Sequence, residues 1–175
     1  MISEGGLLAT VENLSPHSCL VTCDLPMTDG RHYWEVELLQ EGNVGSFEIG
    51  AVPPGLNYEK RHMHRADVYY LNTCGGVLWG SGKSDRNNHG HGILAKGDRI
   101  GCLLDLDAGW LRYYRNGHRF GPGFTSGVTG PLLRAVELCS KGSTVKINVD
   151  AMVPDGVDDE PYWDSGDDAL SERDY

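Results

Sequence analysis

The chain has 175 residues, of which 39% are hydrophobic and 23% are charged, a balance that is ordinary for a globular protein. A length of this order allows one domain that buries well over half of its unfolded surface. The formal net charge of −10 and the pI of about 5.0 disfavour nucleic acid as a partner, and no apolar run is long enough to cross a bilayer.

Targeting and redox features favour an intracellular protein. The first residues lack both a basic leading region and an apolar stretch of signal-peptide length. Five cysteines cannot all pair, and their neighbours are typical of strand interiors, which favours reduced thiols. We therefore expect a cytoplasmic protein, with the nucleus as the alternative compartment.

Negative charge is concentrated at the C-terminal end. Residues 151–175 hold nine of the 25 acidic side chains, and Arg173 is their single base. The segment has few apolar residues and no periodicity, so burial cannot offset a backbone ordering entropy of roughly 1–2 kcal/mol per residue. We expect residues 1–150 to fold as one domain and residues 151–175 to form a disordered acidic tail.

Short runs with a period of two fill the chain from Leu7 to Val149, and no convincing amphipathic helix is found there. In residues 32–38 every second side chain is apolar, which predicts a strand with one face in the core. Residues 47–50 and 99–107 follow the same pattern. The side chains expected to face the core are Trp34, Val36, Leu38, Phe47, Ile49, Ile100, Cys102, Leu104 and Leu106.

Turn residues between these runs predict hairpins. Asn116-Gly117 follows residues 110–115, and this pair tolerates positive φ at both central positions of a type I′ turn. Together with the turn at 107–109 it predicts three consecutive antiparallel strands. Residues 132–138 and 144–149 flank a polar turn and predict a further hairpin. Ten or more short strands with such frequent turns indicate an antiparallel sandwich or barrel.

Four ordered blocks carry a family resemblance. They read GRHYWEVEL (30–38), FEIGAV (47–52), KGDRIGCLLDLDAGWLRYYRNGHRFG (96–121) and GPLLRAVELCSKGSTVKINV (130–149). Over roughly residues 10–150 the chain resembles the SPRY domain, whose most recognisable string is similar to residues 97–105. Asn116-Gly117 stands where that family keeps its hairpin Asn-Gly, and Tyr113 stands where it usually has Phe.

The resemblance implies an all-β fold, an antiparallel, bent, two-sheet β-sandwich of the SPRY or concanavalin-like type. It also implies a partner-binding surface formed by loops at one rim. The chain before Gly30 is too short for the full PRY segment that many relatives carry, so we expect the SPRY-only form. The Trp-Gly pair of the family's short-peptide binders corresponds here to residues 139–142, which read Cys-Ser-Lys-Gly. Their peptide specificity is therefore not expected to transfer.

The longest predicted loops are residues 53–66, 80–92 and 121–130. The first offers Tyr58 as an aromatic anchor among basic residues, and Tyr and Arg are enriched at interface hot spots. The alternative is that these are solvated loop residues. The expected partner-binding residues are Tyr58, Arg61, His62, His64, Arg65, Asp85, Arg86, Asn87, Asn88, Ser140 and Lys141.

These features predict a non-catalytic adaptor or scaffold domain. We expect a monomer that binds a peptide or loop of another protein, with a ubiquitin-ligase or signalling assembly as its setting. No cofactor is expected.

A carbohydrate-binding or glycoside-hydrolysing sandwich is the alternative from another functional class. Glu35 and Glu37 share one strand face, as do Asp105 and Asp107. Side chains at such spacing approach the carboxyl separation of a retaining glycosidase, about 5–5.5 Å. Acidic residues that alternate with apolar ones also occur on any strand with one face in water, and we expect no catalytic residue.

Zinc is a second alternative that the spacing disfavours. The pairs His62/His64 and His89/His91 lie in different loops, and no Cys-x-x-Cys pair accompanies them. We expect these histidines to be exposed to water and no metal to be bound.

Overall fold

The protein is described by a computed structural model that covers residues 2–3, 8–10, 19–23, 25–40, 47–57, 60, 62, 64–73, 76–81, 83–86, 95–138 and 141–156. The described residues form strands and connections, and none of them is helical. They accordingly include no apolar helix of membrane-spanning length. The strands are β1 (Ile2–Ser3), β2 (Leu8–Thr10), β3 (Cys19–Thr22), β4 (Arg31–Gln40), β5 (Phe47–Val52), β6 (Tyr69–Asn72), β7 (Val77–Gly80), β8 (Lys83–Arg86), β9 (Arg99–Asp105), β10 (Trp110–Arg115), β11 (His118–Arg119), β12 (Leu133–Leu138) and β13 (Thr144–Asn148).

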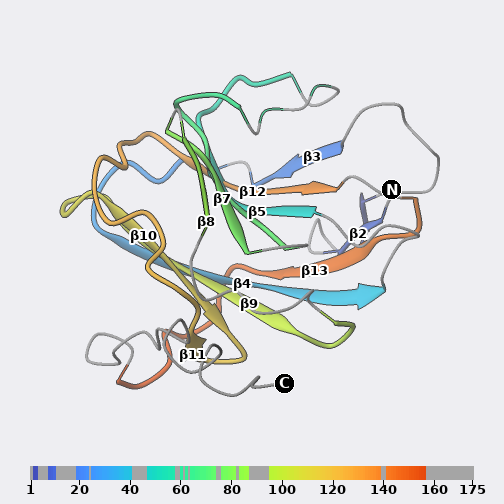
Figure 1. Cartoon of the computed structure of the whole chain (residues 1–175). Helices are drawn as coiled ribbons and strands as arrows, with labels where there is room; N and C mark the ends of the chain where they lie inside the picture. The colour runs from blue at the N-terminus through green and yellow to red at the C-terminus, as the bar shows by residue number, and fades with distance from the viewer. Residues whose placement is uncertain are drawn as a thin grey trace, which may run out of the picture.

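The strands form two antiparallel sheets that stack face to face. The seven-stranded sheet has the order β1-β2-β13-β4-β9-β10-β11, and the six-stranded sheet has the order β3-β12-β5-β6-β7-β8. In Figure 1 the six-stranded sheet lies above the seven-stranded one. The expected all-β, antiparallel two-sheet sandwich is confirmed.

The core lies between the sheets and contains the side chains that the alternation predicts. From β4, Trp34, Val36 and Leu38 are at most 2% exposed. They pack in one cluster with inward-facing side chains of the other strands, including Phe47, Ile49, Ile100, Cys102 and Leu104, and Leu106 packs against its edge.

The three consecutive strands β9, β10 and β11 are confirmed as antiparallel neighbours. At the turn between β10 and β11, Asn116 has φ of 53° and Gly117 has φ of 88°. Both central residues therefore have the left-handed backbone that a type I′ turn requires.

The expected hairpin of residues 132–138 with 144–149 is wrong. β12 pairs with β3 and β5 in the six-stranded sheet, whereas β13 pairs with β2 and β4 in the seven-stranded sheet. Because β12 already has a partner on each edge, the chain after Leu138 crosses to the other sheet instead of turning back.

The expected loop of residues 80–92 is also partly wrong. Lys83–Arg86 forms β8, which pairs with β7 at the edge of the six-stranded sheet. Edge strands commonly carry charged residues, which discourage pairing with another chain. The sequence of β8 therefore has no apolar alternation from which a strand could be predicted.

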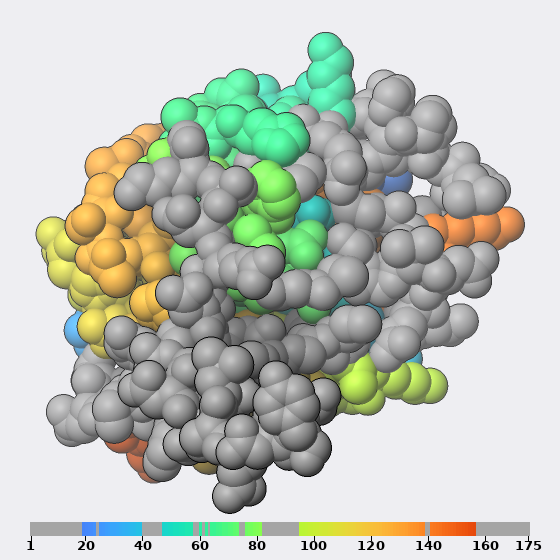
Figure 2. All heavy atoms as spheres, viewed as in Figure 1, coloured from blue at the N-terminus to red at the C-terminus, as the bar shows by residue number. Residues whose placement is uncertain are grey.

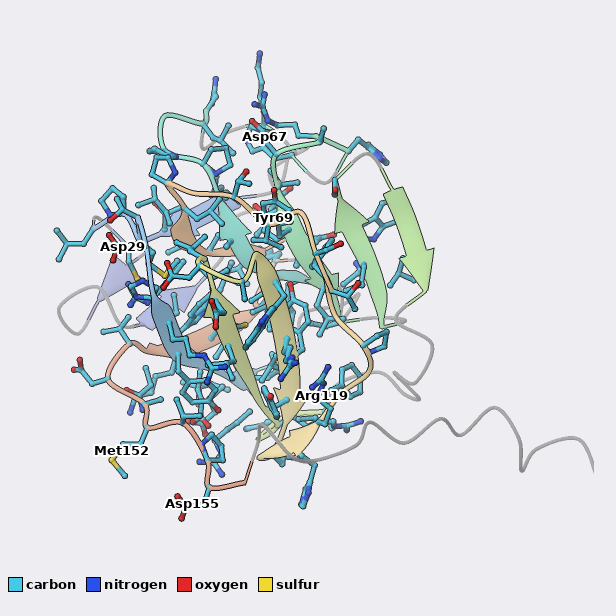
Figure 3. All side chains as sticks on the ribbon, turned by 90° about the vertical axis from the view of Figure 1, so that its left-hand side faces the viewer. Asp29, Asp67, Tyr69, Arg119, Met152 and Asp155 are labelled. Carbon is cyan, nitrogen blue, oxygen red and sulfur yellow. The ribbon has the colours of Figure 1, made fainter. Side chains whose placement is uncertain are left out.

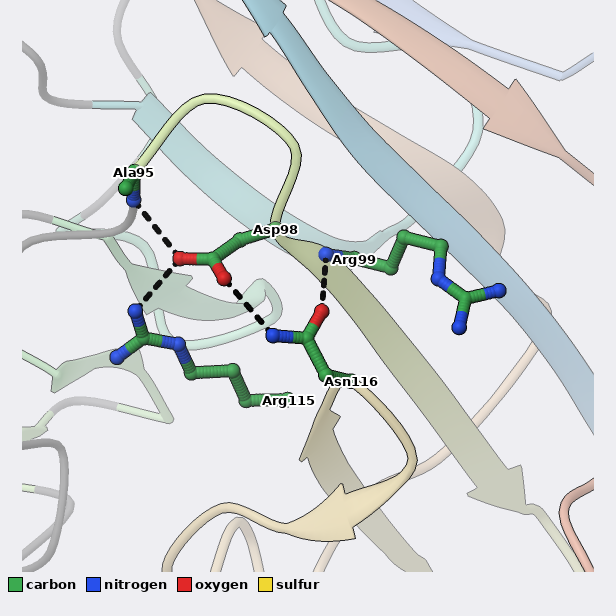
Figure 4. A network of polar contacts seen from close by, with 5 residues as sticks. All are labelled: Ala95, Asp98, Arg99, Arg115 and Asn116. Carbon is green, nitrogen blue, oxygen red and sulfur yellow. Dashed lines mark hydrogen bonds and ion pairs between the residues drawn. The ribbon is translucent and has the colours of Figure 1, made fainter.

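A carboxylate joins the start of β9 to the turn after β10 (Figure 4). Asp98 Oδ2 accepts hydrogen bonds from the Ala95 backbone N–H (2.8 Å) and from Arg115 (2.6 Å), and Oδ1 accepts one from Asn116 Nδ2 (2.8 Å). Asn116 Oδ1 in turn accepts from the Arg99 N–H (2.9 Å). Burial alone would raise the pKa of Asp98, but these hydrogen bonds outweigh it and hold that pKa below its usual range.

The first residues beyond Asp150 return to the outer face of the seven-stranded sheet. Ala151 packs against a small buried cluster of Tyr33, Leu103 and Tyr114. Figure 3 shows Met152 and Asp155 on the side of the molecule opposite Asp67. Residues 157–175 of the predicted acidic tail lie outside the described residues, and their disorder stays a prediction.

We predict that Asp98→Asn lowers the free energy of unfolding by about 1.5–3 kcal/mol at pH 7, the usual contribution of hydrogen bonds to a charged group. A carboxyl group whose pKa is lowered in the folded state stabilises that state above its unfolded pKa, about 3.9. The difference between wild type and variant should therefore shrink as the pH falls through the folded pKa of Asp98. Urea unfolding between pH 7 and pH 3 measures it, with the exposed Asp155→Asn as the control. A difference that does not change with pH would contradict this account.

Candidate functional site

The structure describes the predicted binding residues unequally. The side chains of His62, His64, Arg65 and Lys141 are described, whereas Asp85 and Arg86 are described only as part of β8. The remaining predicted residues lie outside the described part of the chain, and their roles stay predictions. These are Tyr58, Arg61, Asn87, Asn88 and Ser140.

We refer to the connection from β5 to β6 as segment 53–68. Its described residues, 53–57, 60, 62 and 64–68, lie across the outer face of the six-stranded sheet. Leu56 and Val68 pack there in a cluster with Leu20, Val52, Tyr70, Leu133 and Ala135. The backbone N–H of His62 donates to Glu137 Oε2 on β12 (3.3 Å), and the His64 ring contacts Trp79 on β7 edge-on (5.3 Å between centroids). The described residues of segment 53–68 form the upper surface of the molecule in Figure 2. We call this surface the loop face.

His62 is a structural residue of this segment. It is 6% exposed, and its ring Nε2 lies 2.7 Å from the Asn57 carbonyl oxygen, which can only accept a hydrogen bond. The Arg65 backbone N–H donates to the His62 carbonyl (2.9 Å). His62 is therefore hydrogen-bonded to residues both before and after it in the segment. The expectation of a water-exposed histidine is therefore wrong for His62, whereas it is confirmed for His64.

The basic character of the segment is smaller than its composition suggests. Arg65 donates from Nε to Asp67 Oδ1 (2.7 Å) and from its terminal nitrogen to Oδ2 (2.5 Å). The hydrogen bond from Arg65 lowers the pKa of the Asp67 carboxyl, so the pair is doubly ionised and carries no net charge. Lys60 and His64 are exposed beside it.

The predicted residues do not converge on one rim. Lys141 follows β12, and β8 lies beyond β5, β6 and β7 in the same sheet. Four strand spacings of about 4.8 Å separate β12 from β8 by roughly 19 Å. Segment 53–68 spans most of that distance, from Glu137 on β12 to Trp79 on β7. The structure thus brings His62, His64 and Arg65 together in one segment above the six-stranded sheet. Lys141 lies in the β12–β13 connection, and Asp85 and Arg86 lie on the edge strand β8.

Two carboxylates lie beneath segment 53–68. Glu48 on β5 and Glu137 on β12 are directly opposite each other in register, and each is 0% exposed. Glu48 Oε1 accepts from Asn72 Nδ2 on β6 (3.1 Å). The sequence does not reveal that these residues are buried, because a glutamate that alternates with apolar residues is also typical of the solvent-exposed face of a strand.

The four carboxylates of the carbohydrate alternative lie in two different environments. Asp105 accepts from Arg31 Nε (2.7 Å) and from the Ala108 N–H (2.8 Å), and Asp107 accepts from the Gly30 N–H (3.0 Å). These hydrogen bonds show that both aspartates have a structural role at the turn after β9.

Glu35 and Glu37 instead line a shallow depression on the outer face of the seven-stranded sheet. Its other lining residues are Arg99, Lys146 and Asn148. Glu35 accepts from the Tyr33 hydroxyl (3.0 Å) and lies 3.7 Å from Arg99. No three His, Cys, Asp or Glu side chains of the described residues gather in a way that could hold a metal ion.

Comparisons with known proteins agree on one family. Residues 31–152 match the family model described as the SPRY domain. The chain is 24% identical over 156 residues to SPRY domain-containing protein 3 of Homo sapiens, covering 86% of this chain and 35% of that protein. It is 28% identical over 132 residues to Ran-binding protein 9 of Danio rerio, covering 75% of this chain and 21% of that protein. The chain thus spans about a third or less of the length of these curated relatives.

Solved structures show the same fold. The SPRY domain of human HERC1 aligns with a TM-score of 0.63 at 21% identity, covering 85% of this chain and 98% of that one. The crystal structure of a human SPRY domain aligns with a TM-score of 0.69 at 22% identity, covering 86% of this chain and 96% of that one. The TRIM65 PSpry domain aligns with a TM-score of 0.64 at 20% identity, covering 84% of each chain.

We predict that the two neighbouring histidines contribute unequally to stability. His62→Ala should lower the free energy of unfolding by about 1–3 kcal/mol because it removes a buried hydrogen-bonded side chain. His64→Ala should change it by no more than about 0.5 kcal/mol, as is usual at an exposed position. Urea unfolding of both variants at pH 8 measures the difference. Equal effects would show that the buried ring does not hold the segment.

Proposed function

The chain belongs to the SPRY domain family, and from that premise we propose that it is a non-catalytic interaction module that binds a peptide or loop of a partner protein on the loop face. The observation that carries the proposal is the anchoring of described residues of segment 53–68 on the six-stranded sheet, through the His62–Glu137 hydrogen bond and the packing of Leu56 and Val68. A long connection that is anchored by buried contacts can present exposed side chains without an ordering cost at the moment of binding.

The composition of the segment fits this role. Lys60, His64 and Arg65 are exposed and lie close in the sequence to the buried His62, and the same stretch contains Tyr58 and Arg61. Binding surfaces of this kind use aromatic and arginine anchors at their centre and polar contacts at the rim. One relative carries a protein partner in its name, Ran-binding protein 9. We propose an adaptor or scaffold role, with the domain acting as a monomer and needing no cofactor.

The β12–β13 connection is the second part of the proposed surface. Lys141 is exposed there. It lies within residues 139–142, the stretch that corresponds to the family's Trp-Gly pair. Because the corresponding stretch, Cys139-Ser140-Lys141-Gly142, contains no Trp-Gly pair, we propose that aromatic anchoring passes to Tyr58 and that the partner peptide differs from those of the Trp-Gly binders.

We predict that Tyr58→Ala and Arg61→Ala each weaken partner capture about tenfold or more, as expected when a hot-spot side chain is truncated. Tagged wild type and variants are expressed in the native cells, and captured proteins are quantified by mass spectrometry. Lys146→Ala is the matched control because it truncates an exposed side chain on the outer face of the other sheet. Partners that are captured equally by all four proteins would overturn binding on the loop face.

The carbohydrate alternative has one observation in its favour, the depression lined by Glu35 and Glu37. We predict no turnover of β-linked or α-linked glucan oligosaccharides by the wild-type protein, measured as released reducing ends. Turnover that is present in the wild type and lost in a folded Glu37→Gln variant would establish the glycosidase instead.

A further inference from the structure

Beneath segment 53–68 the six-stranded sheet buries two acidic side chains. Glu48 and Glu137 face each other across β5 and β12, and both are fully buried. Directly opposed side chains of an antiparallel pair have Cβ atoms about 4.5–5.5 Å apart, where like charges destabilise the sheet. Burial of an ionised carboxylate is unfavourable unless hydrogen bonds or opposite charges compensate it. Each of these two carboxylates therefore needs hydrogen-bond donors that compensate its burial.

The partners of the two carboxylates differ in kind. Glu48 accepts from Asn72, which lies on the neighbouring strand of the same sheet. Glu137 accepts from the backbone N–H of His62, which lies 75 residues away in the sequence, in segment 53–68. Each carboxylate has at least one further interaction in addition. The bond from Asn72 to Glu48 thus stays within the sheet, whereas the bond from His62 to Glu137 connects the sheet to the segment.

The part of the segment that meets Glu137 is internally bonded. The Lys60 N–H donates to the Asn57 carbonyl (3.2 Å), His62 Nε2 lies 2.7 Å from the same carbonyl oxygen, and the Arg65 N–H donates to the His62 carbonyl (2.9 Å). Asn57, Lys60, His62 and Arg65 are therefore joined by hydrogen bonds within the segment. The hydrogen bond at the His62 N–H joins this part of the segment to β12.

We propose that Glu137 is a positioning residue, whose buried carboxylate holds segment 53–68 closed on the six-stranded sheet and so sets the pose in which the loop face meets its partner. The inference rests on the proposed function for its biological meaning. Its physical content, a closed segment that opens when the carboxylate is removed, is independent of any partner.

Trypsin is a direct probe of this pose, since it cleaves after Lys60, Arg61 and Arg65 within the segment. Cleavage after Arg134 in β12, a central strand of the same sheet, reports global unfolding instead. The measured quantity is the ratio of segment cleavage to Arg134 cleavage under native conditions, followed by mass spectrometry. Local opening raises this ratio, whereas a general loss of stability raises both rates together.

We expect Glu137→Ala to raise the ratio about tenfold or more, because it leaves the His62 N–H without its acceptor. Glu137→Gln keeps an acceptor oxygen but loses the charge that strengthens the hydrogen bond, so we expect a rise of about threefold. Glu37→Ala makes the same truncation on the outer face of the other sheet and should leave the ratio unchanged. If Glu137→Ala does not fold, the Gln variant carries the test.

A ratio that stays at the wild-type value in the folded Glu137 variants overturns the inference. A ratio that rises equally in Glu37→Ala overturns it as well, because the effect would then not belong to Glu137. The capture experiment with Tyr58→Ala separates this result from the proposed function. A raised ratio supports the positioning role even where Tyr58→Ala shows that partners bind elsewhere.

Discussion

The hydroxyl of Tyr113, on β10 of the seven-stranded sheet, donates a hydrogen bond to the carbonyl of Tyr69, on β6 of the six-stranded sheet (3.2 Å). Burial raises the pKa of Tyr113, so the hydroxyl remains a donor. The contact is possible because Gly50 has no side chain: a Cβ at that position would overlap the Tyr69 carbonyl oxygen and lie 2.9 Å from the Tyr113 hydroxyl. This glycine and this tyrosine set how closely the two sheets approach at β6.

The position of β6 in turn supports the loop face. Tyr69 faces the core, where its hydroxyl donates to the Gly127 carbonyl (3.1 Å) and its ring packs edge-on against Phe124. Tyr70 faces the other way and is buried in the cluster that holds Leu56 and Val68 of segment 53–68. One short strand thus joins the two sheets on one side and anchors the candidate binding segment on the other. A rigid frame beneath a connection is what allows that connection to keep a binding pose.

The most recognisable family string is explained by folding rather than by binding. Asp98 lies within that string and Asn116 lies in the Asn-Gly turn after β10, and the two form one hydrogen-bonded network with Arg115 and the Arg99 backbone. Sequence analysis could therefore identify the family and the β10–β11 turn from residues whose role is local. The candidate site could be predicted less well from the sequence, because His62 is buried, Arg65 is paired with Asp67, and β8 lies at the far edge of the sheet. That segment 53–68 binds a partner stays a prediction.

The amino-acid sequence by itself determined which side chains of β4 and β9 face the core and where the chain turns at Asn116-Gly117, because alternation and positive φ are properties of a few neighbouring residues. Only the tertiary structure decided that β12 and β13 belong to different sheets, since strand pairing depends on which edges remain free. It also decided that Glu48 and Glu137 are buried beneath a connection. A period of two separates the two faces of a strand, but it does not say whether water or another segment of the chain covers the outer one.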